Sequence, residues 1–118
     1  MVGLAAVLCP RLSSAADSSA GPVDPARLPV PAATTIDFTR DIQPLLSANC
    51  EKCHGAEKQK GGLRLDAKSA ALKGGDDGKV IVPGKSAESR LIHLVAGLEP
   101  DKPMPPKGER LSLEQISR

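Results

Sequence analysis

The residues with the clearest chemical potential lie in one short stretch, Cys50-Glu51-Lys52-Cys53-His54. This C-x-x-C-H order is typical of covalent c-type haem attachment. Each thiol can add across one vinyl group of the porphyrin, and the two intervening residues let both sulfurs reach one macrocycle. The adjacent histidine can supply an imidazole nitrogen to the iron as proximal ligand. We therefore predict one covalently bound haem c, attached at Cys50 and Cys53 and ligated by His54.

Other uses of the same residues are less consistent with their surroundings. A structural zinc site usually needs four ligands, and the remaining cysteine and histidine, Cys9 and His93, show no ligand-like spacing. A thioredoxin-type dithiol is expected beside a βαβ pattern, which we do not find. A disulfide between Cys50 and Cys53 would close a very small loop and stabilise the fold little. A haem-free redox or binding module stays as an alternative function.

A candidate distal ligand, Met104, lies in the proline-rich segment 101–108. Prolines fix the backbone and can hold one sulfur atom above an iron, whereas the usual merit of methionine as a core residue is its flexibility. His/Met ligation raises the reduction potential of a haem. We predict Met104 as the distal ligand. The alternative, His93, lies off the apolar stripe of its expected helix and is expected to face solvent.

The composition favours one small domain built around a cofactor. The chain has 118 residues with a single aromatic one, Phe38, so few bulky side chains are available to fill a core. A haem would supply a large apolar plate in their place, although a disordered chain would share this composition. The net charge is +2 and the charges are interspersed, which gives no indication of nucleic acid binding.

The amino-acid composition changes along the chain and predicts three regions. Residues 1–16 read as a truncated export signal, because the apolar run 2–8 is followed by a small-x-small cleavage site, Ser14-Ala15-Ala16, but is not preceded by a positively charged segment. The apolar run is too short to span a bilayer. Residues 17–35 are rich in Pro, Ala and Ser and are expected to form a disordered linker. We expect the folded domain over residues 36–118. The predicted location is periplasmic or in the cell envelope, which agrees with haem attachment outside the bacterial cytoplasm.

Short helices are expected to position the haem-binding turn. The first is expected to be capped at its start by Asp37 or Thr39 and to be either kinked or restarted at Pro44. Its apolar positions follow helical spacing and lead into the C-x-x-C-H turn; they are Phe38, Ile42, Leu45 and Leu46. After the turn, Leu63 and Leu65 are expected to lay aliphatic groups against the haem.

Two more helices are expected in the middle of the chain. Asp66 is a possible cap for a helix over 67–73 that stops at Gly74. Ser86 is a possible cap for a helix over 87–96 that stops at Gly97. Between them, residues 76–78 read as a turn and residues 80–82 as an extended segment.

The last expected helix opens with the capping box Ser112-Leu113-Glu114-Gln115. The sequence ends a few residues later, at Arg118, so we expect this helix to be incomplete. The chain would then be a fragment truncated at its C-terminal end.

Together these motifs resemble the planctomycete-type cytochrome c domain. The resemblance covers about residues 36–118 and rests on these parts of the sequence: 38–46, 50–55, 60–66, Gly74-Gly75, 82–85, Ser89 and 104–106. It implies an all-α, class I-like cytochrome c fold around a covalent haem. It also implies Cys50 and Cys53 as attachment points, His54 as proximal ligand and Met104 as distal ligand. Such domains usually begin a much longer exported protein.

The expected function is electron transfer by an exported c-type cytochrome domain, without catalytic activity of its own. An alternative is a haem relay within a larger exported oxidoreductase or hydrolase whose catalytic part is missing. The expected partner is an unidentified redox protein. A group of basic residues could steer an acidic partner toward the haem edge or could simply be a solvated surface; it comprises Lys58, Lys60, Arg64 and Lys68.

Overall fold

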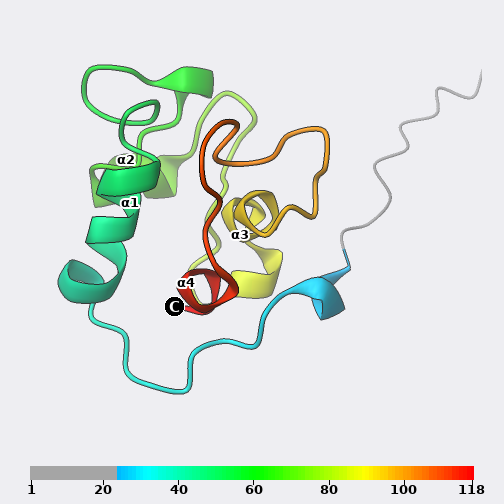
Figure 1. Cartoon of the computed structure of the whole chain (residues 1–118). Helices are drawn as coiled ribbons and strands as arrows, with labels where there is room; N and C mark the ends of the chain where they lie inside the picture. Colours follow the sequence, from blue (N-terminus) through cyan, green and yellow to red (C-terminus); the bar gives the residue numbers. More distant parts are fainter. Residues whose placement is uncertain (1–23) are drawn as a thin grey trace, which may run out of the picture.

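The computed structural model describes residues 24–118, and within this range the chain is helical and forms no β-strand. Figure 1 shows short α-helices joined by long loops, with α1 and α2 on the left and α3 and α4 nearer the centre. The only β-type pairings in the described range are two isolated bridges, His54 with Gln59 and Gly75 with Gly78. The predicted all-α class is confirmed. The predicted export signal, residues 1–16, and the first part of the predicted linker lie outside the described residues.

The first helical segment is divided by Pro44. A π-helical turn, η2 (Phe38–Ile42), precedes helix α1 (Gln43–Asn49). Because proline has no N–H, the α-helical bond to the carbonyl of Arg40 cannot form, and α1 starts afresh with Pro44 in its first turn. Asp37 caps the π-helical turn, since its carboxylate accepts a hydrogen bond from the backbone N–H of Arg40 at 2.8 Å. Of the two predicted versions, a kink at Pro44 or a new helix starting there, the structure shows the new helix.

Helix α2 (Lys68–Lys73) ends at Gly74, as predicted, where the backbone adopts φ 88°. The predicted Asp66 cap is wrong. The Asp66 carboxylate instead accepts two hydrogen bonds from the guanidinium of Arg64, at 2.6 and 2.9 Å. This planar, charge-assisted pairing takes up the oxygens that would have capped the helix.

Helix α3 (Arg90–Val95) is shorter than the predicted helix over 87–96. Residues Ser86–Glu88 form a separate 3₁₀ turn, η4, and Ser89 in extended conformation separates the two. The prediction that Ser86 caps α3 is therefore wrong. The predicted stop is confirmed, because Gly97 follows the helix with φ 73°.

Ser89 explains why the helix is interrupted. The residue is buried, with 4% of its surface exposed, and its hydroxyl accepts a hydrogen bond from the N–H of Val82 at 2.9 Å. The hydroxyl also lies 3.0 Å from the carbonyl oxygen of Lys85, to which it can donate. The buried serine thus connects the segment 82–85 to the start of α3 through hydrogen bonds.

Replacing Ser89 by alanine is expected to lower the free energy of unfolding by about 1–3 kcal/mol, because the N–H of Val82 loses its hydrogen-bond acceptor. Urea unfolding of the parent and variant would measure this difference. Ser86→Ala is the matched control, since Ser86 is exposed and its loss should change stability by less than about 0.5 kcal/mol. Equal stability of parent and Ser89→Ala would refute the structural role of this hydroxyl.

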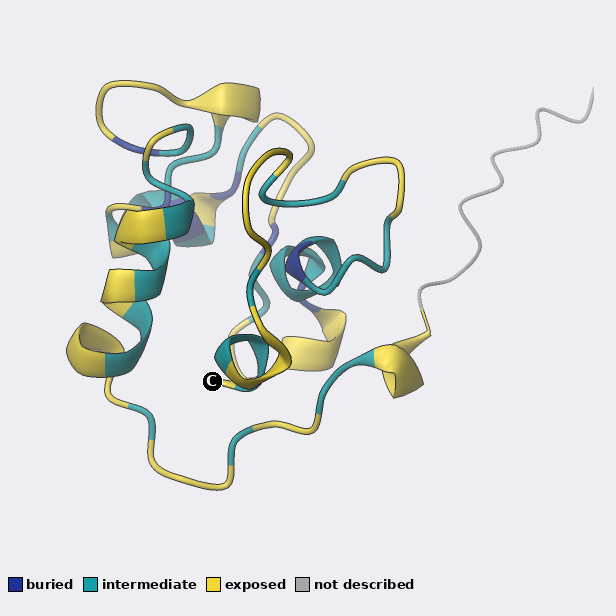
Figure 2. Ribbon diagram, viewed as in Figure 1, coloured by how far each residue is buried: buried dark blue, intermediate teal, exposed yellow. Residues whose placement is uncertain are grey.

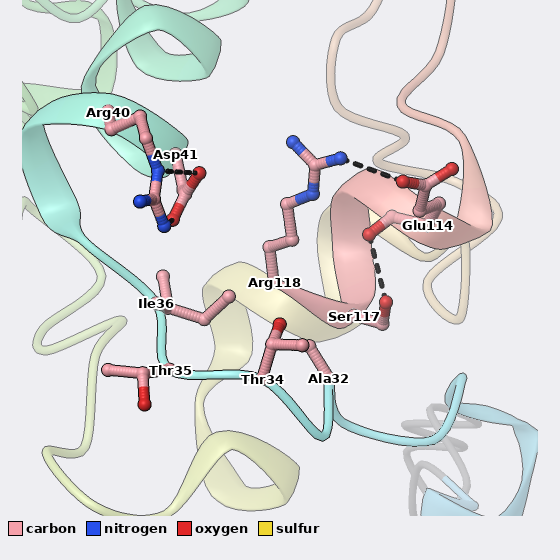
Figure 3. Close-up of a pocket in the computed structure, with 9 residues that line it drawn as sticks. All are labelled: Ala32, Thr34, Thr35, Ile36, Arg40, Asp41, Glu114, Ser117 and Arg118. Carbon is pink, nitrogen blue, oxygen red and sulfur yellow. Dashed lines mark hydrogen bonds and ion pairs between the residues drawn. The ribbon is translucent and has the colours of Figure 1, made fainter.

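Helix α4 (Leu113–Ser117) begins with the predicted capping box, in which Ser112 and Gln115 exchange hydrogen bonds of 3.2 and 2.8 Å. The segment that leads to η2 runs beside α4, and the N–H of Ala32 donates to the carbonyl of Ser117 at 2.8 Å. A hollow of about 430 Å³ lies between this segment, η2 and α4. Figure 3 shows the residues that line it. None of the predicted haem-site residues lines it.

The described residues bury a very small apolar core among themselves. Figure 2 shows how few segments are dark blue, that is, buried. Within residues 24–118 the buried apolar side chains are Leu65, Ala71, Val80 and Val95. The single aromatic side chain, Phe38, is 57% exposed, so the predicted apolar face of the first helix does not include it as a buried residue. No helix in the described range is long and apolar enough to cross a membrane.

Candidate haem site

The C-x-x-C-H motif continues directly from the end of α1. Cys50 is the C-terminal cap of this helix, and its N–H donates to the carbonyl of Leu46 at 2.8 Å. The carbonyl of Cys50 then accepts hydrogen bonds from the N–H groups of Cys53 and His54, at 3.1 and 2.9 Å. One tight turn therefore carries both cysteines and the histidine. Both thiols are free and half-buried.

Backbone hydrogen bonds from the following loop hold this turn from its other side. The carbonyl of Cys53 accepts from Lys60, and that of His54 accepts from Leu65, both at 2.8 Å. Gly55 is buried at the start of the loop, and a Cβ there would collide with the carbonyl oxygen of Glu51. A side chain at this position would therefore distort the backbone of the C-x-x-C-H turn.

The imidazole of His54 is oriented by a backbone carbonyl. Its Nδ1 lies 3.2 Å from the carbonyl oxygen of Leu63. Because a carbonyl can only accept a hydrogen bond, this contact requires the proton on Nδ1 and leaves the lone pair of Nε2 for a metal. The sequence predicts only an aliphatic contact for Leu63. Every residue has a backbone carbonyl, so the residue type does not reveal that this carbonyl accepts a hydrogen bond.

The thiol of Cys50 is electrostatically unlike a redox-active dithiol. Burial, with a smaller contribution from the Glu51 carboxylate, raises the pKa of the Cys50 thiol above its ordinary value. Reactive cysteines of dithiol oxidoreductases instead have lowered pKa values, which favour the nucleophilic thiolate. A raised pKa disfavours the thiolate that disulfide exchange requires.

Met104 and His93 occupy the segment of the chain around α3. Met104 is half-buried, and its N–H donates to the carbonyl of Leu94 in α3 at 3.4 Å. The ring Nε2 of His93, half-buried rather than fully exposed, lies 2.7 Å from the carbonyl of Ala87. The backbone of Met104 is therefore hydrogen-bonded to α3, and one ring nitrogen of His93 is in contact with a backbone carbonyl. Ligation of one iron by both His54 and Met104 remains a prediction.

The residues present fit a haem. Several large aliphatic side chains are only half-buried by protein atoms, and their burial against a flat, apolar group would be favourable; they include Leu45, Leu46, Leu63, Leu91 and Leu94. Two thiols, an imidazole and a thioether are the side-chain types that hold a His/Met c-type haem. Across residues 24–118, no group of three or more His, Cys, Asp or Glu side chains is placed to hold a bare metal ion.

A small helical domain with a C-x-x-C-H turn at the end of its first helix defines a c-type cytochrome domain. Residues 50–108, half of the chain, match the family described as Planctomycete cytochrome C. The protein belongs to this family, which is the one that the sequence motifs resemble. The matched residues include Cys50, Cys53, His54 and Met104. Comparisons with curated proteins and with solved structures found no match.

Proposed function

We propose that this protein is an electron-transfer module carrying one covalently attached haem c. The observation that supports this most directly is the single turn in which two free thiols accompany an imidazole whose Nδ1 faces the Leu63 carbonyl. When bound, a haem supplies one-electron redox chemistry between Fe(III) and Fe(II). Cys50 and Cys53 would hold it covalently, and His54 would present Nε2 to the iron.

The remaining residues of the proposed site orient ligands and exclude water. The hydrogen bond between Nδ1 of His54 and the Leu63 carbonyl sets the ring orientation and raises the basicity of the ligand. Met104, held to α3 through its backbone, would supply the distal sulfur. The half-buried leucines would cover the faces of the haem, and the lower polarity around it would influence the reduction potential.

We also propose that the chain is exported and exchanges electrons with a redox partner protein that is not yet identified. Export is supported by the apolar run and small-x-small site in residues 1–16, together with membership of a cytochrome c family. In this proposal, residues 17–35 link the signal to a haem domain over residues 36–118.

The test is expression of the full chain with bacterial cytochrome c maturation machinery, followed by acid-acetone extraction. We expect the colour to stay with the protein and its mass to increase by one haem. We also expect a redox titration followed by absorbance to show reversible one-electron behaviour. Colourless protein, or haem that is lost on extraction, would refute covalent attachment. Haem that stays but cannot be cycled would refute electron transfer.

A further inference from the structure

We propose that Arg90 and Glu99 form a clamp that positions the Met104 segment against the haem-binding half of the domain. This inference rests on the proposed role of Met104 as distal ligand. The two side chains meet in a fork: Nε and Nη2 of Arg90 donate to Oε1 and Oε2 of Glu99 at 2.9 and 3.0 Å. Such a bidentate, charge-assisted pair fixes both distance and orientation. Arg90 and Glu99 are therefore assigned as positioning residues.

The clamp is more sheltered than a nearby ion pair of the same chain. The side chains of Arg90 and Glu99 are 30% and 24% exposed, whereas those of Lys85 and Glu88, 3.5 Å apart, are 61% and 63% exposed. Solvent weakens an ion pair that is fully exposed much more than one that is partly covered. The hydrogen bonds from Arg90 lower the pKa of Glu99, so its carboxylate is ionised at neutral pH.

On one side, Glu99 lies within a segment that is fixed to α3 at two points. The N–H of Leu98 donates to the carbonyl of His93 at 2.9 Å, and the N–H of Met104 donates to the carbonyl of Leu94 at 3.4 Å. The second of these bonds is long. The Arg90–Glu99 fork adds a side-chain tie between these two points and so limits how far the Met104 segment can move from α3.

On the other side, Arg90 connects to the haem-binding turn through a short series of contacts. Its Nη1 lies 3.4 Å from Oδ2 of Asp77, in the turn that follows α2. The N–H of the preceding residue, Asp76, donates to the carbonyl of Gly61 at 2.8 Å. Gly61 belongs to the loop whose Lys60 is bonded to the carbonyl of Cys53. Arg90 therefore stands between the two segments from which the two axial ligands would come.

Without the fork, the Met104 segment would depend on its backbone bonds to α3, and the methionine would leave the iron more often. The test uses the full-length, haem-loaded protein and the variant Glu99→Gln, in which an amide NH₂ replaces an acceptor of the fork. We expect a weaker ferric methionine–iron charge-transfer band. We also expect about tenfold tighter carbon monoxide binding to the ferrous form, because apparent affinity follows the fraction of open sites.

Two matched variants separate positioning from general destabilisation. Glu99→Asp keeps the carboxylate and should restore most of the charge-transfer band. Glu88→Gln removes a carboxylate from the exposed pair beside α3 and should leave the band and carbon monoxide affinity as in the parent. A folded Glu99→Gln protein with the parent's band and carbon monoxide affinity overturns the clamp. A parent protein that lacks the band overturns the methionine ligand, and the clamp with it.

A measurement on the parent protein covers the case in which Glu99→Gln fails to fold. Imidazole added to the ferric parent displaces a methionine ligand. If the clamp acts on the Met104 segment, the Nε–H of Arg90 should then exchange with solvent at least about tenfold faster. The Nε–H of Arg64, paired with Asp66, is the internal reference and should not change. An unchanged exchange rate at Arg90 overturns the proposal.

Discussion

Protein in which Cys50 and Cys53 are both replaced by alanine is expected to contain no covalently attached haem. Each cysteine can form one thioether bond, and both lie as free thiols in the single turn that ends in His54. Cys53→Ser alone should leave at most one such bond and a strongly reduced haem content. The measurement is the mass of the matured, acid-acetone-extracted protein, together with its haemochrome spectrum.

Cys9→Ala is the control for this experiment. Cys9 lies outside the described residues, in the stretch that the sequence predicts to be a removed export signal, so its replacement should leave haem content as in the parent. Haem yield in the double variant equal to that of the parent would show that attachment does not use these cysteines. Loss of haem in Cys9→Ala as well would point to a failure of export rather than of attachment.

Replacing Met104 by alanine is expected to open the sixth coordination position. The ferric methionine–iron charge-transfer band should disappear, and the ferrous protein should bind carbon monoxide. The reduction potential should fall, because the soft thioether sulfur favours ferrous iron. For a one-electron couple, each tenfold loss of preference for the ferrous state lowers the potential by about 59 mV, and we expect at least one such step.

His93→Ala is the matched control for Met104→Ala. His93 lies in α3, where its ring contacts the carbonyl of Ala87, and it is the other side chain considered as distal ligand. This variant should keep the charge-transfer band and the carbon monoxide affinity of the parent. A band that persists in Met104→Ala means that Met104 is not the ligand. If Met104→Ala has the spectrum and carbon monoxide affinity of the parent, and His93→Ala lacks the sixth iron ligand, the role of distal ligand belongs to His93.

Features that depend on neighbouring residues were determined by the sequence alone. The C-x-x-C-H order, the helix restart at Pro44, the stops at Gly74 and Gly97, and the capping box at Ser112 all act over a few residues. Their physical causes are a missing N–H, a backbone conformation that favours glycine, and a short side-chain hydrogen bond. Local chemistry of this kind leaves few competing solutions. The described backbone confirms the stops at Gly74 and Gly97 and the capping box, and it shows the restart at Pro44 rather than the kink that the sequence left open. The family match confirms the resemblance to planctomycete-type cytochrome c.

Only the tertiary structure decided which partner each polar side chain takes. Ser86 and Asp66 are both acceptable local caps, yet the buried Ser89 binds the Val82 backbone and Asp66 pairs with Arg64. The fork between Arg90 and Glu99 likewise depends on how a loop returns to α3. A polar side chain has several acceptable partners, and the one it binds depends on which backbone or charge the fold brings within about 3 Å of it.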